Sequence, residues 1–230
     1  MPVTGAAKID ALESLRKQLG RQIKSGTELL QEREQRGVCL VTGLDGLDET
    51  PGGGLPRGQL TEIIGRGPSR GLGVVMGALL ARARGEGRYV MLLDVGAGFS
   101  IESFPEGDLE SLLRVGCDSA KQAVEALDVA TRDENFHLFL LDGRDCEPSD
   151  WKSVRTQQWY RILNQLRQRE AVAVLFARSE VTAATKHRLE VVSRLALGDL
   201  HQERLVILSR TQFQPVRHFT EERAEALRAG

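Results

Sequence analysis

Three uninterrupted apolar runs restrict what this chain can fold into more than any other feature of the sequence. They are YVMLLD at Tyr89–Asp94, HLFLLD at His137–Asp142 and AVAVLFA at Ala171–Ala177. Strands that are buried on both faces have this continuous pattern, whereas a strand with one solvated face alternates apolar and polar residues. Helical patterns separate the runs. The sequence therefore predicts an α/β fold of three layers, in which helices cover both faces of a mainly parallel sheet.

The remaining core elements are expected to alternate in the same way. We expect strands at Leu60–Ile64 and Leu112–Val115, and helices at Val74–Arg84, Ser119–Thr131 and Trp151–Arg169. Asp118 or Ser119 is the expected N-cap of the middle helix. Near the end of the chain, Arg194–Leu197 and Arg204–Leu208 flank a polar turn. This pattern predicts an antiparallel hairpin at the C-terminal edge of the sheet.

An amphipathic helix is expected before the core, from about Lys8 to Arg36. Its apolar residues recur every three or four positions, which places them on one stripe: Ile9, Leu12, Leu15, Leu19 and Ile23. The stripe either packs on the chain's own domain or docks on a neighbouring protein, and the sequence leaves both open. The predicted organisation is an N-terminal helical segment at 1–37 for partner binding or self-association, a core at 38–219 and a charged tail at 220–230.

Composition narrows the function classes. The formal net charge is −1, so nucleic-acid binding would need a local patch and not a global basic field. The three cysteines, Cys39, Cys117 and Cys146, are odd in number and far apart, which predicts neither disulfides nor a metal site. No run approaches the length of a membrane span. We expect a cytoplasmic protein without a metal or a membrane anchor.

Two segments are candidates for a local nucleic-acid patch. One is the helix that carries Trp159, Tyr160, Arg161, Arg167 and Arg169, and the other is the polar segment Arg178–Arg188. A solvated helix face and a solvated loop are the more common explanations of such patterns.

The loop after Leu60–Ile64 has the position of a phosphate-binding loop but not its residues. Ligands of parallel sheets bind at the carboxyl ends of the strands. A working loop reads G-x-x-x-x-G-K-[ST], in which the lysine neutralises phosphates and the hydroxyl holds Mg²⁺. Here Leu72 and Gly73 follow Gly71. A backbone nest that binds phosphate or sulfate weakly is all that the loop retains, with Arg66, Ser69 and Arg70 nearby.

Two aspartates complete this remnant of a nucleotide site. Asp142 follows an apolar strand as a Walker B aspartate does, although a carboxylate that caps the next turn is the simpler interpretation. Asp94 ends its strand similarly, and the following Val95-Gly96-Ala97-Gly98 offers no general base for activating water. The remnant thus comprises Gly65, Arg66, Gly67, Ser69, Arg70, Gly71, Leu72, Gly73, Asp94 and Asp142, without a catalytic residue or a cofactor.

The order of these features resembles the bacterial recombinase RecA over residues 38–219. The most specific match is TGLDGLDETPGGGLPRGQLTEIIG at Thr42–Gly65, and EGRYVMLLD, FPEGDLESLLRV, AKQAVEALDVATRDENFHLFLLD and RLVILSRTQFQP resemble later RecA segments in turn. Among RecA-like families the chain is most similar to ImuA, which shares the PGGGLP-x-G element, the short length and an often degenerate P-loop. The resemblance implies a RecA-like P-loop NTPase fold.

The chain departs from the RecA pattern at residues that bind or hydrolyse ATP and in the loops that bind DNA. Lys-Thr is replaced by Leu72-Gly73, and the catalytic glutamate by Gly96. Ser209 and Thr211, on either side of Arg210, replace lysines of a late strand that reach a neighbour's nucleotide. The DNA-binding loops correspond to Gly143–Lys152 and Ser179–Lys186, and both are shortened.

The resemblance implies a non-catalytic RecA-like adaptor in bacterial SOS-induced mutagenesis and translesion DNA synthesis. Its implied partners are RecA and a Y-family polymerase homologue (ImuB-like), with a second copy of the chain and weakly bound single-stranded DNA as further candidates. Phe213–Arg228 is a candidate partner-binding tail. Two alternatives stay open: an ATP- and DNA-binding repair or recombination protein, and a SulA-type cell-division inhibitor.

Overall fold

A seven-stranded sheet in the order β5-β4-β6-β7-β3-β8-β9 organises the chain, and all its neighbouring strands are parallel except β8 and β9. The computed structural model describes residues 39–49, 53–67, 71–193, 198–199, 202 and 204–216. The strands are β3 (Gln59–Ile64), β4 (Tyr89–Val95), β5 (Leu112–Cys117), β6 (Phe136–Asp142), β7 (Val172–Ala177), β8 (His187–Val191) and β9 (Phe213–Pro215). A separate antiparallel pair consists of β1 (Cys39–Leu40) and β2 (Leu55–Pro56).

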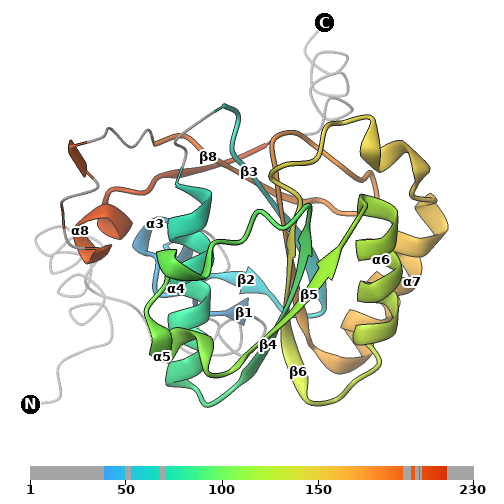
Figure 1. Cartoon of the computed structure of the whole chain (residues 1–230), viewed down its shortest axis with the longest axis horizontal. Helices are drawn as coiled ribbons and strands as arrows, with labels where there is room; N and C mark the ends of the chain where they lie inside the picture. Colours follow the sequence, from blue (N-terminus) through green and yellow to red (C-terminus); the bar gives the residue numbers. More distant parts are fainter. Residues whose placement is uncertain are drawn as a thin grey trace, which may run out of the picture. The chain divides into compact units, whose positions relative to one another are not determined.

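Helices cover both faces of the sheet, as Figure 1 shows. One side carries α4 (Leu72–Gly85), with α5 (Glu106–Leu109) and α8 (Arg204–Ser209) packed beside it. The other side carries α6 (Ala120–Ala130) and α7 (Thr156–Arg169). Shorter elements are α3 (Asp45–Asp48) and the 3-10 turns η2 (Ile101–Ser103) and η3 (Asp150–Ser153). The three layers and the mainly parallel sheet agree with the sequence prediction.

The continuous apolar runs are explained by burial on both faces. In β6, Leu138 and Leu140 pack into the core on the α4 side, while Phe139 and Leu141 pack into the core on the α6 and α7 side. Successive strand residues point to opposite faces, so a strand covered on both sides needs an apolar residue at every position.

The expected core strands and helices are confirmed with small changes in their ends. Ser119 is the N-cap of α6, and its Oγ accepts a hydrogen bond from the Gln122 N–H at 3.2 Å. The helix expected from Trp151 begins only at Thr156, because η3 at Asp150–Ser153 precedes it.

The expected C-terminal hairpin is wrong in its residues. Arg204–Ser209 is helix α8, and the antiparallel edge is instead formed by β8 and β9, with Glu190 opposite Gln214. An apolar run of four residues, LVIL at Leu205–Leu208, fits a helix or a strand equally well by periodicity, which explains the error. Residues 194–197 lie outside the described residues.

The TGLDGLD segment owes its pattern to one carboxylate. Asp48 accepts hydrogen bonds from the Thr42 N–H at 2.9 Å, the Thr42 hydroxyl at 2.8 Å and the Gly43 N–H at 2.8 Å. Leu44 and Leu47 are buried beneath this turn. Gly54, at φ +128°, is required because a Cβ there would overlap the carbonyl oxygen of Leu40. The segment therefore fixes how the chain enters β3.

None of the helices in the described part of the chain combines the length and the apolar character needed to cross a bilayer. The predicted segments at 1–37 and 220–230 fall outside the described residues, as do the stripe residues Ile9, Leu12, Leu15, Leu19 and Ile23.

Candidate functional site

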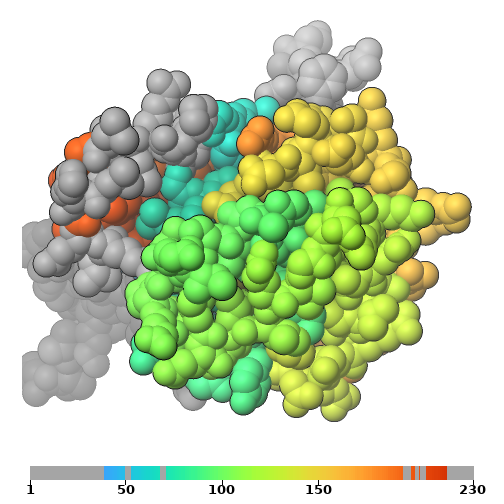
Figure 2. Space-filling view, in the orientation of Figure 1, coloured from blue at the N-terminus to red at the C-terminus, as the bar shows by residue number. Residues whose placement is uncertain are grey.

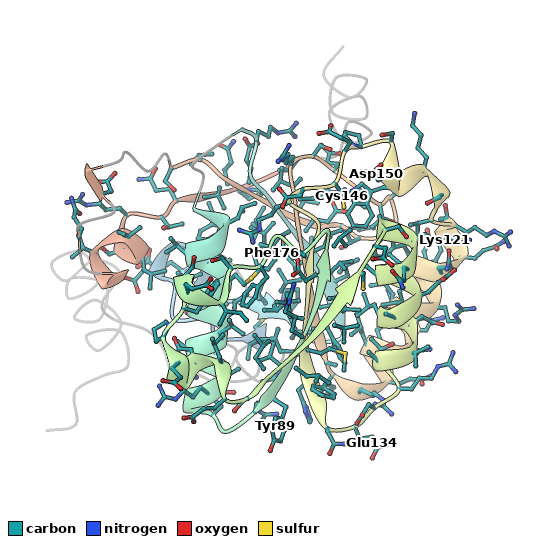
Figure 3. All side chains as sticks on the ribbon, viewed as in Figure 1. Tyr89, Lys121, Glu134, Cys146, Asp150 and Phe176 are labelled. Atoms are coloured by element: carbon teal, nitrogen blue, oxygen red, sulfur yellow. The ribbon has the colours of Figure 1, made fainter. Side chains whose placement is uncertain are left out.

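The strands β3, β4 and β6 end at one edge of the sheet, and the loops that follow them form the candidate site. Asp94 of β4 is in register with Asp142 of β6. In the space-filling view, the teal, green and yellow segments that contain these loops adjoin in the upper part of the molecule (Figure 2). Cys146 and Asp150 lie at this end of the sheet, opposite Tyr89 and Glu134 (Figure 3). We call this end the carboxyl edge.

The loop from β3 to α4 has neither the lysine nor the hydroxyl residue of a phosphate-binding loop after Gly71, where the sequence has Leu72 and Gly73. Gly67 and Gly71 have positive φ angles of 94° and 79°, and Gly71 is the N-cap of α4 without a side-chain hydrogen bond. Leu72, at the position where the motif predicts a lysine, is buried in the core on the α4 side. Of the predicted remnant, Ser69 and Arg70 lie outside the described residues.

Arg66 was expected to stand near an anion. Its guanidinium instead forms ion pairs with Glu190 at 3.2 Å and with Glu180 at 3.4 Å. Carboxylates therefore already compete for this side chain, which weakens the expected anion nest.

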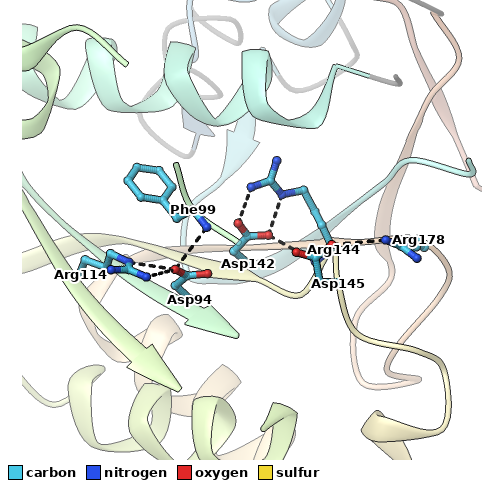
Figure 4. A network of polar contacts seen from close by, with 7 residues as sticks. All are labelled: Asp94, Phe99, Arg114, Asp142, Arg144, Asp145 and Arg178. Carbon is cyan, nitrogen blue, oxygen red and sulfur yellow. Dashed lines mark hydrogen bonds and ion pairs between the residues drawn. The ribbon is translucent and has the colours of Figure 1, made fainter. Parts of the chain in front are cut away.

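Asp142 is neutralised by a residue two positions later in the chain. Its Oδ1 accepts from the Arg144 Nε at 2.7 Å, and its Oδ2 accepts from Arg144 Nη2 at 2.6 Å (Figure 4). The Arg144 backbone N–H also points to Oδ1 at 3.3 Å, as expected of a carboxylate that caps the following turn. The hydrogen bonds with Asp142 raise the pKa of the Arg144 guanidinium, so Arg144 stays charged.

Asp94 is neutralised in the same manner from the neighbouring strand. Its Oδ2 accepts from Arg114 Nε at 2.8 Å and Nη2 at 2.6 Å, and from the Phe99 N–H at 3.3 Å. Its Oδ1 is buried and has no hydrogen-bond partner among the described residues. Gly96, at φ +77°, follows the strand and supplies no side chain to the edge.

Figure 4 shows that the network continues to a third acidic residue. Asp145 accepts from Arg178 Nη2 at 3.3 Å, and Arg178 also lies 3.6 Å from Glu147. The arginines drawn in this network, Arg114, Arg144 and Arg178, each have a carboxylate partner.

A cleft of about 490 Å³ opens beside this network, on the α6 side of the sheet. Its lining includes Val95, Gly96, Asp118, Ser119, Asp145 and Cys146. Among the described residues of the loop from Gly65 to Gly73, which are 65–67 and 71–73, none lines the cleft. Several lining residues carry a sequence prediction, namely Asp118 or Ser119 as an N-cap and Gly143–Lys152 as a shortened DNA-binding loop, but no sequence pattern predicts that they line one cleft.

Burial, together with the nearby carboxylates of Asp150, Asp142 and Asp145, raises the pKa of the Cys146 thiol to about 11. The described residues contain no group of three or more His, Cys, Asp or Glu side chains placed to hold a metal ion. The cleft thus offers neither a reactive thiolate nor a metal site.

Ser209 and Thr211 do not lie on a late strand, which corrects the expected correspondence. Ser209 ends α8 and its hydroxyl donates to the Val206 carbonyl at 2.9 Å, while the Thr211 hydroxyl donates to the Ile207 carbonyl at 3.0 Å. Thr211 is buried. Both hydroxyls thus donate to carbonyl groups of α8.

The segment Arg178–Arg188 is not simply a solvated loop. His187 and Arg188 belong to β8, and Arg188 is buried, with its Nε donating to Glu62 Oε2 at 2.6 Å. Glu62 Oε1 also accepts from the Thr182 N–H at 2.8 Å. Arg188 is therefore a core residue and is excluded from any nucleic-acid patch.

The basic helix α7 has the expected core face. Trp159 is buried and Tyr160 is exposed, while Arg161 donates to the buried Asp128 of α6 at 2.7 Å. Arg169 donates to the carbonyl of Arg132. These contacts join α7 to α6 and its following turn, and they account for two of the arginines without nucleic acid.

Comparison with known proteins finds no family model that matches the chain, and no match among curated proteins.

Proposed function

We propose that this chain is a RecA-like protein that has given up nucleotide chemistry and acts as an adaptor in bacterial SOS-induced mutagenesis and translesion synthesis. The proposal rests on the resemblance of residues 38–219, and the P-loop NTPase assignment is part of it. One observation supports the part of the proposal that concerns the loss of nucleotide chemistry. Asp94 and Asp142, the two carboxylates that end adjacent central strands, are each neutralised by an arginine of the same chain.

The residues present do not fit Mg·ATP. Binding of Mg·ATP at such a loop needs a lysine, a hydroxyl and an unoccupied carboxylate. Here the corresponding positions hold the buried Leu72, the side-chain-free Gly73 and an Asp142 whose two oxygens already accept from Arg144. An ATP-dependent repair or recombination activity is accordingly disfavoured. The partners proposed are RecA and a Y-family polymerase homologue.

The test is a pull-down with the tagged full-length chain from bacterial cells before and after DNA damage. Recovery of RecA and of a Y-family polymerase homologue from damaged cells is the expected result. Recovery of the tubulin-like division protein in their place would favour the SulA-type alternative, and recovery of none of them would remove the adaptor proposal.

A matched pair of variants sharpens the test at the expected docking stripe. Leu12→Asp places a charge on the stripe and is expected to abolish recovery of at least one partner. Lys17→Asp introduces the same side chain between stripe positions and is expected to leave recovery unchanged. Equal recovery with both variants would show that the stripe is not the docking surface.

A further inference from the structure

The guanidinium of Arg144 lies between two positions that hold a metal ion in a working phosphate-binding loop. On one side it donates to both oxygens of Asp142, at 2.7 and 2.6 Å. On the other side its Nη1 lies 3.4 Å from the point at which a Cβ of Gly73 would stand, in the first turn of α4. The side chain therefore spans from the end of β6 to the start of α4.

In a working loop, a Ser or Thr hydroxyl and a strand-end aspartate hold Mg²⁺ from these two sides. This chain has Gly73 and Asp142 there, with a guanidinium between them. A guanidinium resembles the metal in its positive charge, and its planar fork matches both oxygens of a carboxylate. It differs in having no open coordination position, so it cannot bridge to phosphates as Mg²⁺ does.

We propose that Arg144 is a built-in cation that takes the place of the divalent metal at Asp142 and keeps metal ions out. The proposal rests on the proposed function, because it identifies Asp142 with the metal-holding aspartate of an ATPase. It goes further because it assigns a function to Arg144, a residue that belongs to none of the sequence motifs.

Burial makes such a substitute necessary. Asp142 is only 2% exposed, and a buried carboxylate without a partner is strongly destabilising. The Oδ1 of the neighbouring Asp94 is also buried without a hydrogen-bond partner among the described residues. Removal of Arg144 would thus leave carboxylate oxygens from two adjacent strands at one edge, which are the ligands that hard divalent cations prefer.

The test is the response of thermal unfolding to Mn²⁺ from 0 to about 10 mM, with ionic strength held constant by KCl. We expect Mn²⁺ to raise the Tm of the Arg144→Ala variant by about 3 °C, through binding to the folded state alone. The Tm of wild type is expected to shift by less than about 1 °C, because the Arg144 guanidinium still occupies Asp142. The Tm of the double variant Asp142→Asn/Arg144→Ala is also expected to shift by less than about 1 °C, because it lacks the carboxylate that would bind Mn²⁺.

Arg144→Gln is measured in parallel, since its amide keeps a hydrogen bond to Asp142 without a charge and supports folding if the alanine variant is too unstable. A folded Arg144→Ala or Arg144→Gln protein that ignores Mn²⁺ would overturn the proposal, as would an equal shift in wild type. Mg·ATP binding by wild type would instead refute the proposed function, so the two failures are separable.

Discussion

Replacing Arg188 with methionine is expected to be among the most destabilising single changes in the described part of the chain. Arg188 is 2% exposed and its partner Glu62 is fully buried, on adjacent strands of the sheet. Methionine keeps much of the side-chain volume and removes the charge, so Glu62 loses its charged partner and keeps backbone hydrogen bonds from Thr182 and Val181. Breaking a buried pair in this way costs about 3–5 kcal/mol.

The assay is urea unfolding followed by the fluorescence of Trp151 and Trp159, both of which are buried. With a urea dependence of about 2–3 kcal/mol per molar, the midpoint should fall by about 1–2 M. Arg178→Met is the matched control, because Arg178 is 52% exposed and its ion pairs lie at the surface. That variant should cost less than about 1 kcal/mol.

The pH dependence supplies a second check. Burial raises the pKa of Glu62, and the Thr182 N–H and Arg188 both lower it. Loss of Arg188 removes a lowering influence, so the pKa of Glu62 in the folded variant rises further above its unfolded value. Protonated Glu62 costs less to bury than its carboxylate, so its contribution to the free energy of unfolding is present at low pH. That contribution is lost as the pH rises through the pKa of Glu62 in the folded state. The deficit of Arg188→Met should therefore be smaller at pH 5 than at pH 8.

The double variant Glu62→Gln/Arg188→Met removes both charges and should recover about 2 kcal/mol or more of the loss, because a neutral amide costs less to bury than a carboxylate. The reasoning is refuted if Arg188→Met is no less stable than Arg178→Met at pH 8, or if its deficit grows as the pH falls.

Three further predictions concern local structure and reactivity. Ser119→Ala removes the N-cap of α6 and should cost about 1 kcal/mol by urea unfolding, whereas Ser119→Gly should cost only a few tenths of that. Gly54→Ala should lower the free energy of unfolding by more than about 2 kcal/mol, because the added Cβ overlaps the Leu40 backbone and the φ angle is unfavourable for alanine. Gly43→Ala should lower it by about 1 kcal/mol, because Gly43 has an unfavourable φ of +78° but no atom within 4 Å of the added Cβ. Cys117 and Cys146 are buried and desolvation raises the pKa of both thiols, so Ellman's reagent at pH 8 should modify them only as fast as the protein unfolds; rapid labelling of the native chain would contradict their placement.

The sequence predicted those parts of the fold whose residues report burial directly. Runs such as YVMLLD and AVAVLFA are apolar at every position because both faces of the sheet are covered, and β4 and β7 lie where they were expected. The strand β8 was missed for the opposite reason. Its residues HRLEV look solvated, yet Arg188 is buried against Glu62, and no local pattern shows that two distant charges neutralise each other.

The losses expected in the candidate site stay a prediction from the motif, whereas the arrangement of its side chains could not be predicted. Leu72, Gly73 and Gly96 can be recognised from the motif alone, because each lacks a group that the chemistry needs. The role of Arg144 depends on the path of the loop after β6, which brings its guanidinium to Asp142 and to the first turn of α4. The cleft beside α6 is likewise a product of packing, and its acidic residues are scattered through the sequence.

The most direct test of the central claim is a calorimetric titration of the full-length chain with Mg·ATP, with an intact RecA protein titrated in the same buffer as the positive control. Three features oppose binding: the buried Leu72, the missing hydroxyl at Gly73, and the occupation of Asp142 by Arg144. No saturable heat is expected up to millimolar nucleotide. Saturable binding of Mg·ATP at micromolar concentration would show that the chain has a working nucleotide site.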